Sequence, residues 1–515
     1  MAGLAKIGPA QGEQRQNATK GKNIVIGVFF DGTCNNMNNT DDRKKNDAKY
    51  LDNKHHWYGG YADKGDDSYE NEYSNIARLF TNYKNENPPV LYKTYIEGIG
   101  TTDHDSDDSS GYAFGAGDTG IPAKVKKGCL NVANKIKDAV KTDNVKIVNT
   151  LTIDLFGFSR SAAAARHFVY EITKPGYNAN KVTTRNCTFF YDEMGNPSEF
   201  EIFPYRGYLG AYTKGIKILD LVIRFVGLFD TVASYAWGGA VPGPFSDDTP
   251  DSFENDTKQL HLDAIGRAEV KKVVHLTAAD EVRKFFPLTN IKSAKKKCID
   301  KELPGVHSDI GGGYTDSKED IKRLMQVHLL YNKDLLENFK NELIKEGWYI
   351  EKELSIEKRA SIDLYQYCLR GNRDFIISKI YSFIPLYFMC ELALNYDTKK
   401  SIPFDLSKLQ QQYSISGYTF MQTIKDRLHK YVFDGAPPMK LGDSSAIRVN
   451  DAGQYIREKR KSETENNEIQ ETANLMALRR YYLHQSANYD RHSARSEPMA
   501  PRIENEERKR EHLDG

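Results

Sequence analysis

The chain has 515 residues, and its 72 lysines and arginines nearly balance its 71 aspartates and glutamates, which gives a formal net charge of +1. This balance excludes a chain that is basic along its whole length, the usual signature of a nucleic-acid binder or a polybasic membrane protein. Six dispersed cysteines without a C-x-x-C pair exclude zinc ribbons and c-type haem attachment.

The first residues favour a leader followed by a buried strand. Residues 1–22 are polar and have no apolar stretch of the kind found in secretory signal peptides, so we expect a disordered leader. Residues 24–30, IVIGVFF, are continuously apolar and predict a buried parallel strand that ends at Asp31. Residues 31–72 are rich in Asn, Asp and Lys and are expected to form loops.

Strands and helices then alternate along the chain. Apolar runs predict strands at 24–30, 88–100, 146–156, 217–229 and 272–279. Apolar positions three and four apart predict helices at 73–84, 121–142 and 160–173. This alternation indicates an α/β fold with a mostly parallel sheet over residues 23–320. The polar segments 190–215 and 238–260 are expected to be insertions at the C-terminal edge of that sheet.

The character of the sequence changes after residue 320. Residues 321–452 are expected to form a helical cap or membrane-apposing region. Within it, 376–395 is interrupted by Pro385 and too polar for a transmembrane helix, so we expect a core or cap helix there, with a membrane-facing cap helix as the alternative. Residues 453–515 carry many charges of both signs and predict a surface helix followed by a tail of about 25 residues that is disordered, or ordered only on a partner.

A serine lies at the point where a strand passes directly into a helix. The pentapeptide Gly157-Phe158-Ser159-Arg160-Ser161 joins the strand predicted at 146–156 to an Ala-rich helix. A nucleophile elbow occurs at such a junction, and it needs small neighbours because strand and helix approach closely. The helix N-terminus also favours negative charge that develops on the serine oxygen. Ser159 is therefore a candidate nucleophile.

An acid and a histidine follow this serine in the order found in α/β-hydrolases. Asp230 follows the predicted strand at 217–229, and His307 lies in the Gly-rich stretch PGVHSDIGGGY. Ser159, Asp230 and His307 thus form a candidate triad. Asp280, at the end of another predicted strand, is an alternative acid, although an ion-pair cluster with its neighbours is the preferred interpretation. Asp309 is expected to cap the Gly-rich loop or the next helix.

Two backbone amides are candidates for an oxyanion hole. One is the amide of Arg160, directly after the candidate nucleophile, and the other is that of Gly32 or Thr33, in the loop after the first predicted strand. Asp31 is expected to brace that loop. Two other histidines, His167 and His275, fall inside predicted elements and are expected to be buried core residues.

No motif requires a cofactor. The run from Asp103 to Asp108 supplies hard oxygen ligands that suit Ca²⁺, but it lacks the spacing of an EF-hand, so a solvated loop is the preferred interpretation. The sequence contains neither a P-loop nor a dinucleotide-binding fingerprint, and it has no H-E-x-x-H zinc motif. We therefore expect no cofactor, with Ca²⁺ left open.

Several motifs in order resemble a known family. The segments FFDGT, YIEGIGT, GYAFGAG, GFSRSAAAAR, GLFDTVAS, HLTAADEVRKFFP and PGVHSDIGGGY are similar to those of the α/β-hydrolase-like domain in the first family of type VI secretion lipase effectors. The resemblance covers roughly residues 23–320. Two positions depart from the family pattern, because Ser161 replaces a usual glycine and Phe229 a common tryptophan. Neither change removes a reactive group.

The resemblance implies an antibacterial phospholipase A that acts on membrane phospholipid. Such effectors travel on a VgrG secretion spike into the periplasm of a neighbouring cell, and a cognate immunity protein protects the producer. The resemblance also implies that Ser159 is the nucleophile, Asp230 the orienting acid and His307 the general base. Two alternatives stay open: a serine esterase for soluble acyl esters, and a catalytically silent delivery or binding module.

Overall fold

The computed structural model describes residues 21–48, 67–85, 90–108, 111, 115, 117–143, 146–185, 187–234, 256–318, 322–328, 333–360, 365–396, 402–460, 462–488, 501–504 and 507–515. The expected leader at 1–22 lies almost entirely outside the described residues. The same holds for most of the expected insertion at 238–260.

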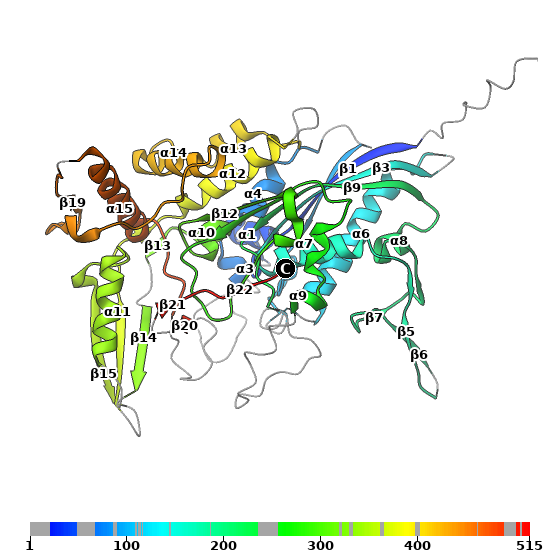
Figure 1. Cartoon of the computed structure of the whole chain (residues 1–515). Coiled ribbons are helices and arrows are strands. Elements are labelled where there is room, and N and C mark those ends of the chain that lie inside the picture. Colours follow the sequence, from blue (N-terminus) through cyan, green and yellow to red (C-terminus); the bar gives the residue numbers. More distant parts are fainter. Residues whose placement is uncertain are drawn as a thin grey trace, which may run out of the picture.

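Six parallel strands form the central sheet, in the order β12-β10-β9-β3-β1-β2 (Figure 1). The strands are β1 (Lys22–Phe30), β2 (Leu91–Ile96), β3 (Ile147–Phe158), β9 (Lys217–Phe229), β10 (Val273–Ala278) and β12 (Cys298–Leu303). Five of them confirm the predicted strands and the α/β fold class. The sequence CIDKEL of β12 did not predict a strand, because three consecutive charged residues hide the short apolar pattern of this edge strand.

Helices cover both faces of the sheet and create two hydrophobic cores. Helices α6 (Ile121–Ala139) and α7 (Arg160–Glu171) pack on one face, and α4 (Asn75–Asn82) and α12 (Phe383–Leu394) pack on the other. Successive residues of β1 alternate between the cores, with Val28 on the α6 and α7 side and Phe29 on the α4 and α12 side. The predicted helices at 73–84, 121–142 and 160–173 are thus confirmed.

The polar insertion expected at 190–215 lies at the other edge of the sheet. It belongs to a segment that connects the end of α7 to the start of β9, so it emerges at the N-terminal edge and not at the C-terminal edge as predicted. The segment contains two small antiparallel sheets and one helix: β4 (Tyr177–Asn178) with β8 (Ile202–Phe203), β5 (Asn180–Thr183) with β6 (Thr188–Tyr191) and β7 (Pro197–Ser198), and α8 (Gly207–Tyr212).

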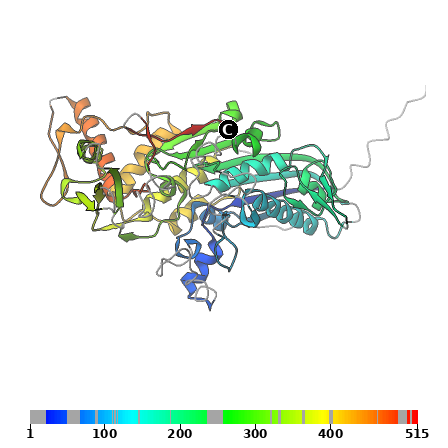
Figure 2. The same ribbon diagram turned by 90° about the horizontal axis from the view of Figure 1, so that it is seen from below.

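The region expected to be a helical cap also contains strands. Three antiparallel strands, β14 (Lys322–His328), β15 (Leu354–Ala360) and β16 (Tyr365–Gly371), pair around a central β16, with α11 (Lys333–Lys345) beside them. The expectation of a helical region over 321–452 was therefore wrong for these strands. This sheet and the β5–β7 hairpin lie at opposite ends of the elongated molecule (Figures 1 and 2).

Helix α12 is a core helix. Ten of its twelve residues are buried, and it packs against α4, β9 and β10. The core interpretation of 376–395 is thus confirmed over the membrane-facing alternative. Within the described ranges, every helix is too short or too polar to cross a bilayer. The sequence did not predict α1 (Met37–Lys45), which lies in a stretch expected to be loop. This helix begins where the Asn36 side chain accepts hydrogen bonds from the amides of Asn38 and Asn39.

The charged C-terminal region is more ordered than its sequence suggests. Helix α15 (Glu463–Tyr481) confirms the predicted helix, but it buries side chains such as Leu475 and Leu478. The last residues were expected to be disordered. Instead, β22 (His512–Leu513) pairs in parallel with β11 (Leu288–Thr289), and the chain end crosses to the main sheet (Figure 1).

Candidate active site

The candidate residues meet at the C-terminal edge of the central sheet. Ser159 follows β3, Asp230 follows β9, and His307 follows β12 by way of a short loop. In open α/β sheets, ligands bind outside the carboxyl ends of the strands, which is where these side chains gather.

Ser159 occupies the strained turn that an elbow requires. Its backbone has φ of 63° and ψ of −138°, a region that few residues other than glycine adopt. Its amide donates to Phe229 O at 3.1 Å, which ties the turn to the neighbouring strand. A Cβ at Gly157 would lie 2.7 Å from Ser161 O, so the strand can approach the helix this closely only with glycine at 157.

Asp230 and His307 form a buried pair. Asp230 Oδ2 and His307 Nδ1 are 2.5 Å apart, and the carboxylate is fully buried. Burial alone would raise the pKa of Asp230, but the Arg510 guanidinium and the His307 hydrogen bond outweigh it and hold that pKa well below its ordinary value. Burial lowers the pKa of the His307 imidazole, against the opposing effect of Asp230. The pair therefore combines an ionised acid with a neutral imidazole.

The imidazole packs against the residue that precedes Ser159, although no hydrogen bond joins it to the serine. The His307 ring packs 4.6 Å from the Phe158 ring, measured between centroids, and Phe158 directly precedes Ser159. Among the described residues, His307 Nε2 is buried without a hydrogen-bond partner. The imidazole thus keeps one ring nitrogen without a partner in the described part of the chain. Hydrogen bonds between a catalytic base and its nucleophile often form fully only when substrate binds.

The rival acids have other partners. Asp280 pairs with Arg479 at 2.7 Å and accepts the Gly305 amide at 2.7 Å, so it is Asp230 and not Asp280 that contacts the imidazole. The expected cluster of Asp280 with its neighbours is only partly present, because Glu281 and Arg283 pair with each other and not with Asp280.

Asp309 caps α10 (His307–Gly311) by accepting the amide of Val306, as expected. It also contacts His484, which sequence reasoning did not find.

The first loop supplies one candidate oxyanion donor. The Gly32 amide donates to Asp31 Oδ1 at 2.7 Å, so it is already used, contrary to its expected role. The Thr33 amide makes no hydrogen bond to another described residue, and Thr33 Oγ1 lies 3.4 Å from Ser159 Oγ. The amide of Arg160 begins α7, where backbone N–H groups point out of the helix.

Asp31 braces this loop, as expected. Its carboxylate accepts hydrogen bonds from the Tyr95 hydroxyl at 2.5 Å and from the Ser74 hydroxyl. Burial raises the pKa of Asp31 to about 6, against these hydrogen bonds. The two predicted core histidines are also confirmed as buried, since His167 is 3% exposed and His275 is fully buried.

Asp230 has a charged partner that sequence reasoning missed. Arg510, in the expected disordered tail, donates to both oxygens of Asp230, at 2.7 Å through Nη1 and at 2.9 Å through Nη2. No motif surrounds Arg510 in the sequence, and 280 residues separate it from Asp230. Only the fold reveals this contact.

The Asp-rich run does not gather carboxylates for a metal ion. Its side chains accept hydrogen bonds from different partners: Asp103 from Asn38, Asp107 from the Ser68 amide, and Asp108 from Thr119. Among the described residues, no group of three or more His, Cys, Asp or Glu side chains is arranged to hold a metal.

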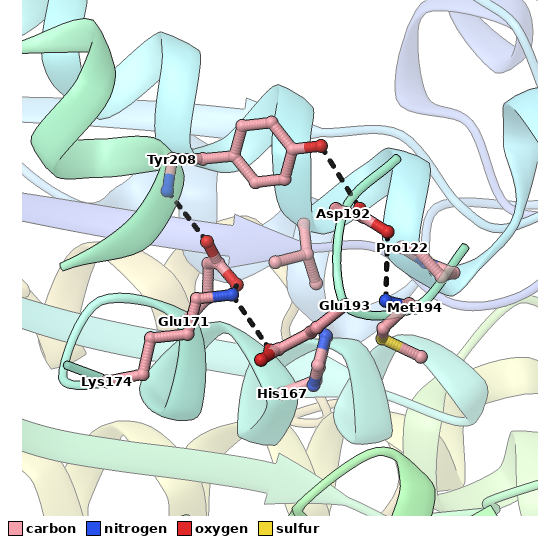
Figure 3. A pocket seen from close by; sticks show the side chains of 9 residues that line it. Pro122, His167, Glu171, Lys174, Asp192, Glu193, Met194 and Tyr208 are labelled. Carbon is pink, nitrogen blue, oxygen red and sulfur yellow. Dashed lines mark hydrogen bonds and ion pairs between the residues drawn. The ribbon is translucent and has the colours of Figure 1, made fainter. Parts of the chain in front are cut away.

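A polar crevice beside α7 is not part of this site. Figure 3 shows that its charged side chains pair with one another. Lys174 contacts Glu171 at 2.6 Å and Glu193 at 2.8 Å, while Tyr208 donates to Asp192 at 3.1 Å. These groups neutralise each other and fasten the insertion at the N-terminal edge to α7.

Comparison with known proteins places the region of the candidate site in a known family. Residues 22–332 match the family model described as the catalytic domain of type VI secretion system Tle1-like phospholipase effectors. A solved structure of the Tle1 effector bound to the VgrG spike has 20% sequence identity and a TM-score of 0.55, and covers 96% of this chain and 94% of that chain.

A second solved structure, of an uncharacterised Pseudomonas aeruginosa protein, has 18% identity and a TM-score of 0.29, and covers 58% of this chain and 42% of that one. No curated protein matches the sequence. Because the family model spans more than half of its length, the chain belongs to the Tle1-like phospholipase effectors of the type VI secretion system.

Proposed function

We propose that this effector is a phospholipase A that cleaves acyl esters of membrane phospholipid through Ser159, Asp230 and His307. The observation that carries the proposal is the 2.5 Å contact of Asp230 with His307 beside the strained turn of Ser159. Membership of the phospholipase effector family supports the choice of a lipid ester as substrate.

The reaction follows from the roles of these groups. His307 Nε2 takes the proton of Ser159 Oγ, and the oxygen attacks the acyl carbonyl carbon. The amides of Thr33 and Arg160 stabilise the oxyanion, each by roughly 2.7–4 kcal/mol. The tetrahedral intermediate then breaks the ester C–O bond, and the His307 imidazolium protonates the leaving glycerol oxygen. The acyl group is left on Ser159.

Water completes the cycle. It gives one proton to His307 Nε2 while its oxygen attacks the acyl-serine, and the fatty acid leaves as the serine regains a proton. Asp230 holds the imidazole in the tautomer that carries its proton on Nδ1. Ser159 is 3% exposed, so an acyl chain reaches it only after neighbouring groups shift. The cycle needs no group from outside the chain other than water.

The family and the solved relative suggest how the protein is used. The similar Tle1 effector is described as bound to a VgrG spike. We propose that this chain docks on a VgrG spike in the same way and acts on phospholipid in the periplasm of a target bacterium. A cognate immunity protein would then protect the producing cell.

Hydrolysis of position-labelled phospholipid tests the activity. We expect wild type to release fatty acid, detected by mass spectrometry, and Ser159→Ala to release none. Ser161→Ala is the matched control, because Ser161 Oγ is buried two residues away without a hydrogen-bond partner among the described residues. Activity in Ser159→Ala would refute the nucleophile. A preference for short soluble esters over micellar phospholipid would favour the alternative of a serine esterase for soluble substrates. Failure of a fluorophosphonate to label Ser159 would favour the alternative of a catalytically silent module.

A further inference from the structure

We propose that Arg510 is a positioning residue for the Asp230–His307 pair, which makes the chain from Arg510 onward a working part of the active site. The inference rests on the proposed function of that pair. Residues 507–515 lie beyond the region that the family model matches, so the family comparison does not assign them any role.

The Arg510 guanidinium is fully engaged at the acid. Nη1 and Nη2 donate to the two oxygens of Asp230, and Nε donates to Phe286 O at 2.8 Å. Nη1 also lies 3.3 Å from Ala278 O. Arg510 is 8% exposed. A planar guanidinium that binds both carboxylate oxygens fixes the plane of the carboxylate, which a lysine ammonium cannot do.

The segment around Arg510 is seated by its backbone. Leu288 N donates to Glu511 O at 2.7 Å, and Asn290 N donates to Leu513 O at 3.0 Å. These bonds hold the backbone that directly follows Arg510. The ion pair of Arg508 with Glu346, at 2.6 Å, lies before Arg510 in the chain and does not involve Asp230. The guanidinium therefore reaches Asp230 from an anchored backbone.

This anchoring sets the orientation of the acid. The Ala278 amide donates to Asp230 Oδ1 at 2.9 Å, while Oδ2 is shared between Arg510 and His307. With both oxygens held, the carboxylate presents Oδ2 to Nδ1 in one direction. Without Arg510, the Oδ2 atom would keep only His307 as a partner, and the imidazole would lose its fixed orientation toward Ser159.

The positive charge of Arg510 also acts on the imidazole. Arg510 and His307 contact the same oxygen, so the guanidinium opposes protonation of the ring and offsets part of the attraction from Asp230. Other charged or titratable groups around the pair are Glu281, which accepts the His307 amide, its partner Arg283, Glu302 on β12, the Asp309–His484 pair, and His512, which interacts with both Arg510 and Asp230. Of these, Glu281 favours the imidazolium and Arg283 opposes it.

Three variants test the proposal: Arg510→Gln, Arg510→Lys and the control Arg508→Gln, which removes a tail ion pair away from Asp230. We expect Arg510→Gln to lower kcat at least about tenfold with little change in KM. Its acid limb in the pH profile of kcat/KM should move to higher pH, because Arg510 no longer opposes protonation of the imidazole. Arg510→Lys should keep the acid limb and lose kcat, and Arg508→Gln should keep both.

Several outcomes would overturn the proposal. One is that Arg510→Gln keeps the wild-type kcat and pH profile. Another is that Arg508→Gln loses as much kcat as Arg510→Gln, which would show that the contact of Arg510 with Asp230 only holds the C-terminal segment in place. If Arg510→Gln does not fold, the result for Arg510→Lys decides. An unchanged kcat in Arg510→Lys rejects the positioning role, and a lower kcat with an unchanged acid limb supports it. Labelling of wild-type Ser159 by a fluorophosphonate is measured first, because its absence refutes the proposed function and not the role of Arg510.

Discussion

The carboxylate of Asp309 is held by His484 on both of its oxygens. Oδ1 lies 2.7 Å from the imidazole Nδ1, and Oδ2 accepts the His484 amide at 3.1 Å. Because Asp309 lies in α10, which begins at His307, the segment after α15 fixes the helix that carries the candidate base. The buried Asp309–His484 pair thus holds the helix that carries His307, the partner of Asp230.

We expect His484→Ala to destabilise the fold by about 1–3 kcal/mol, since it leaves a buried carboxylate with one fewer partner. Urea unfolding measures this loss. His429→Ala is the control, because its pair with Glu391 is partly exposed and should contribute about 0–1 kcal/mol. An equal loss of unfolding free energy in the two variants would show that the contact of His484 with Asp309 stabilises the fold no more than a partly exposed pair does.

The choice of acid is tested by two amide substitutions. Asp230→Asn should lower kcat by about 10⁴-fold, because the imidazole loses the carboxylate that fixes its tautomer. Asp280→Asn should lower kcat far less, since Asp280 contacts Arg479 and the Gly305 amide. Steady-state kinetics on a fluorescent phospholipid compares them. The reverse order would transfer the role of the acid to Asp280.

The pH profile should show a base that stays neutral in mild acid. Burial lowers the pKa of His307 below its ordinary value of about 6.5, so the midpoint of the acid limb of kcat/KM should lie below pH 6.5. The same lowered pKa means that protonation favours the unfolded chain, so stability should decline as pH falls below about 6.5. An acid limb centred above 6.5 would contradict this environment for His307.

Gly157→Ala should disrupt the serine turn. The added Cβ would lie 2.7 Å from Ser161 O, which is backbone and cannot rotate away, so α7 must shift. We expect a loss of both stability and fluorophosphonate labelling. Gly417→Ala is the control, because a Cβ there meets nothing within 4 Å. Normal labelling of Gly157→Ala would show that the close approach of strand and helix is dispensable.

Chelation should leave the activity unchanged. The carboxylates of Asp103, Asp107 and Asp108 already accept hydrogen bonds from different protein groups, and the proposed cycle uses only protein groups and water. The measurement is phospholipid hydrolysis in EDTA, followed by added Ca²⁺. Activity that EDTA abolishes and Ca²⁺ restores would place a metal in the reaction.

Local patterns predicted most of the sheet and the identity of the candidate residues. Apolar runs such as IVIGVFF mark strands buried on both faces, Ser159 and Asp230 follow such runs, and His307 lies in a Gly-rich stretch. The pattern failed in the edge strand β12 and in the antiparallel strands β14 to β16. There, consecutive charged residues, as in CIDKEL and LSIEKRA, leave neither a continuous apolar run nor a clear alternation.

Long-range partners could not be predicted in this way. Asp309 meets His484, and Asp230 meets Arg510, only because distant segments fold onto the same edge of the sheet. The charged composition around Arg510 is typical of a solvated tail, and nothing in its neighbours indicates a buried carboxylate as its partner. The Gly32 amide likewise cannot serve as an oxyanion donor because it donates to Asp31 Oδ1. That bond depends on the conformation of Asp31, which the residue types alone do not predict.

Translation makes the chain from its N-terminus, so the strands, the serine turn and His307 all leave the ribosome before Arg510 does. If Arg510 positions the acid as inferred, Asp230 receives its guanidinium only after all of these elements have been made. A chain assembled in this order has an incomplete active site until Arg510 has been synthesised and has folded back onto the sheet. The order of synthesis would thus delay lipid hydrolysis until the whole catalytic region is in place.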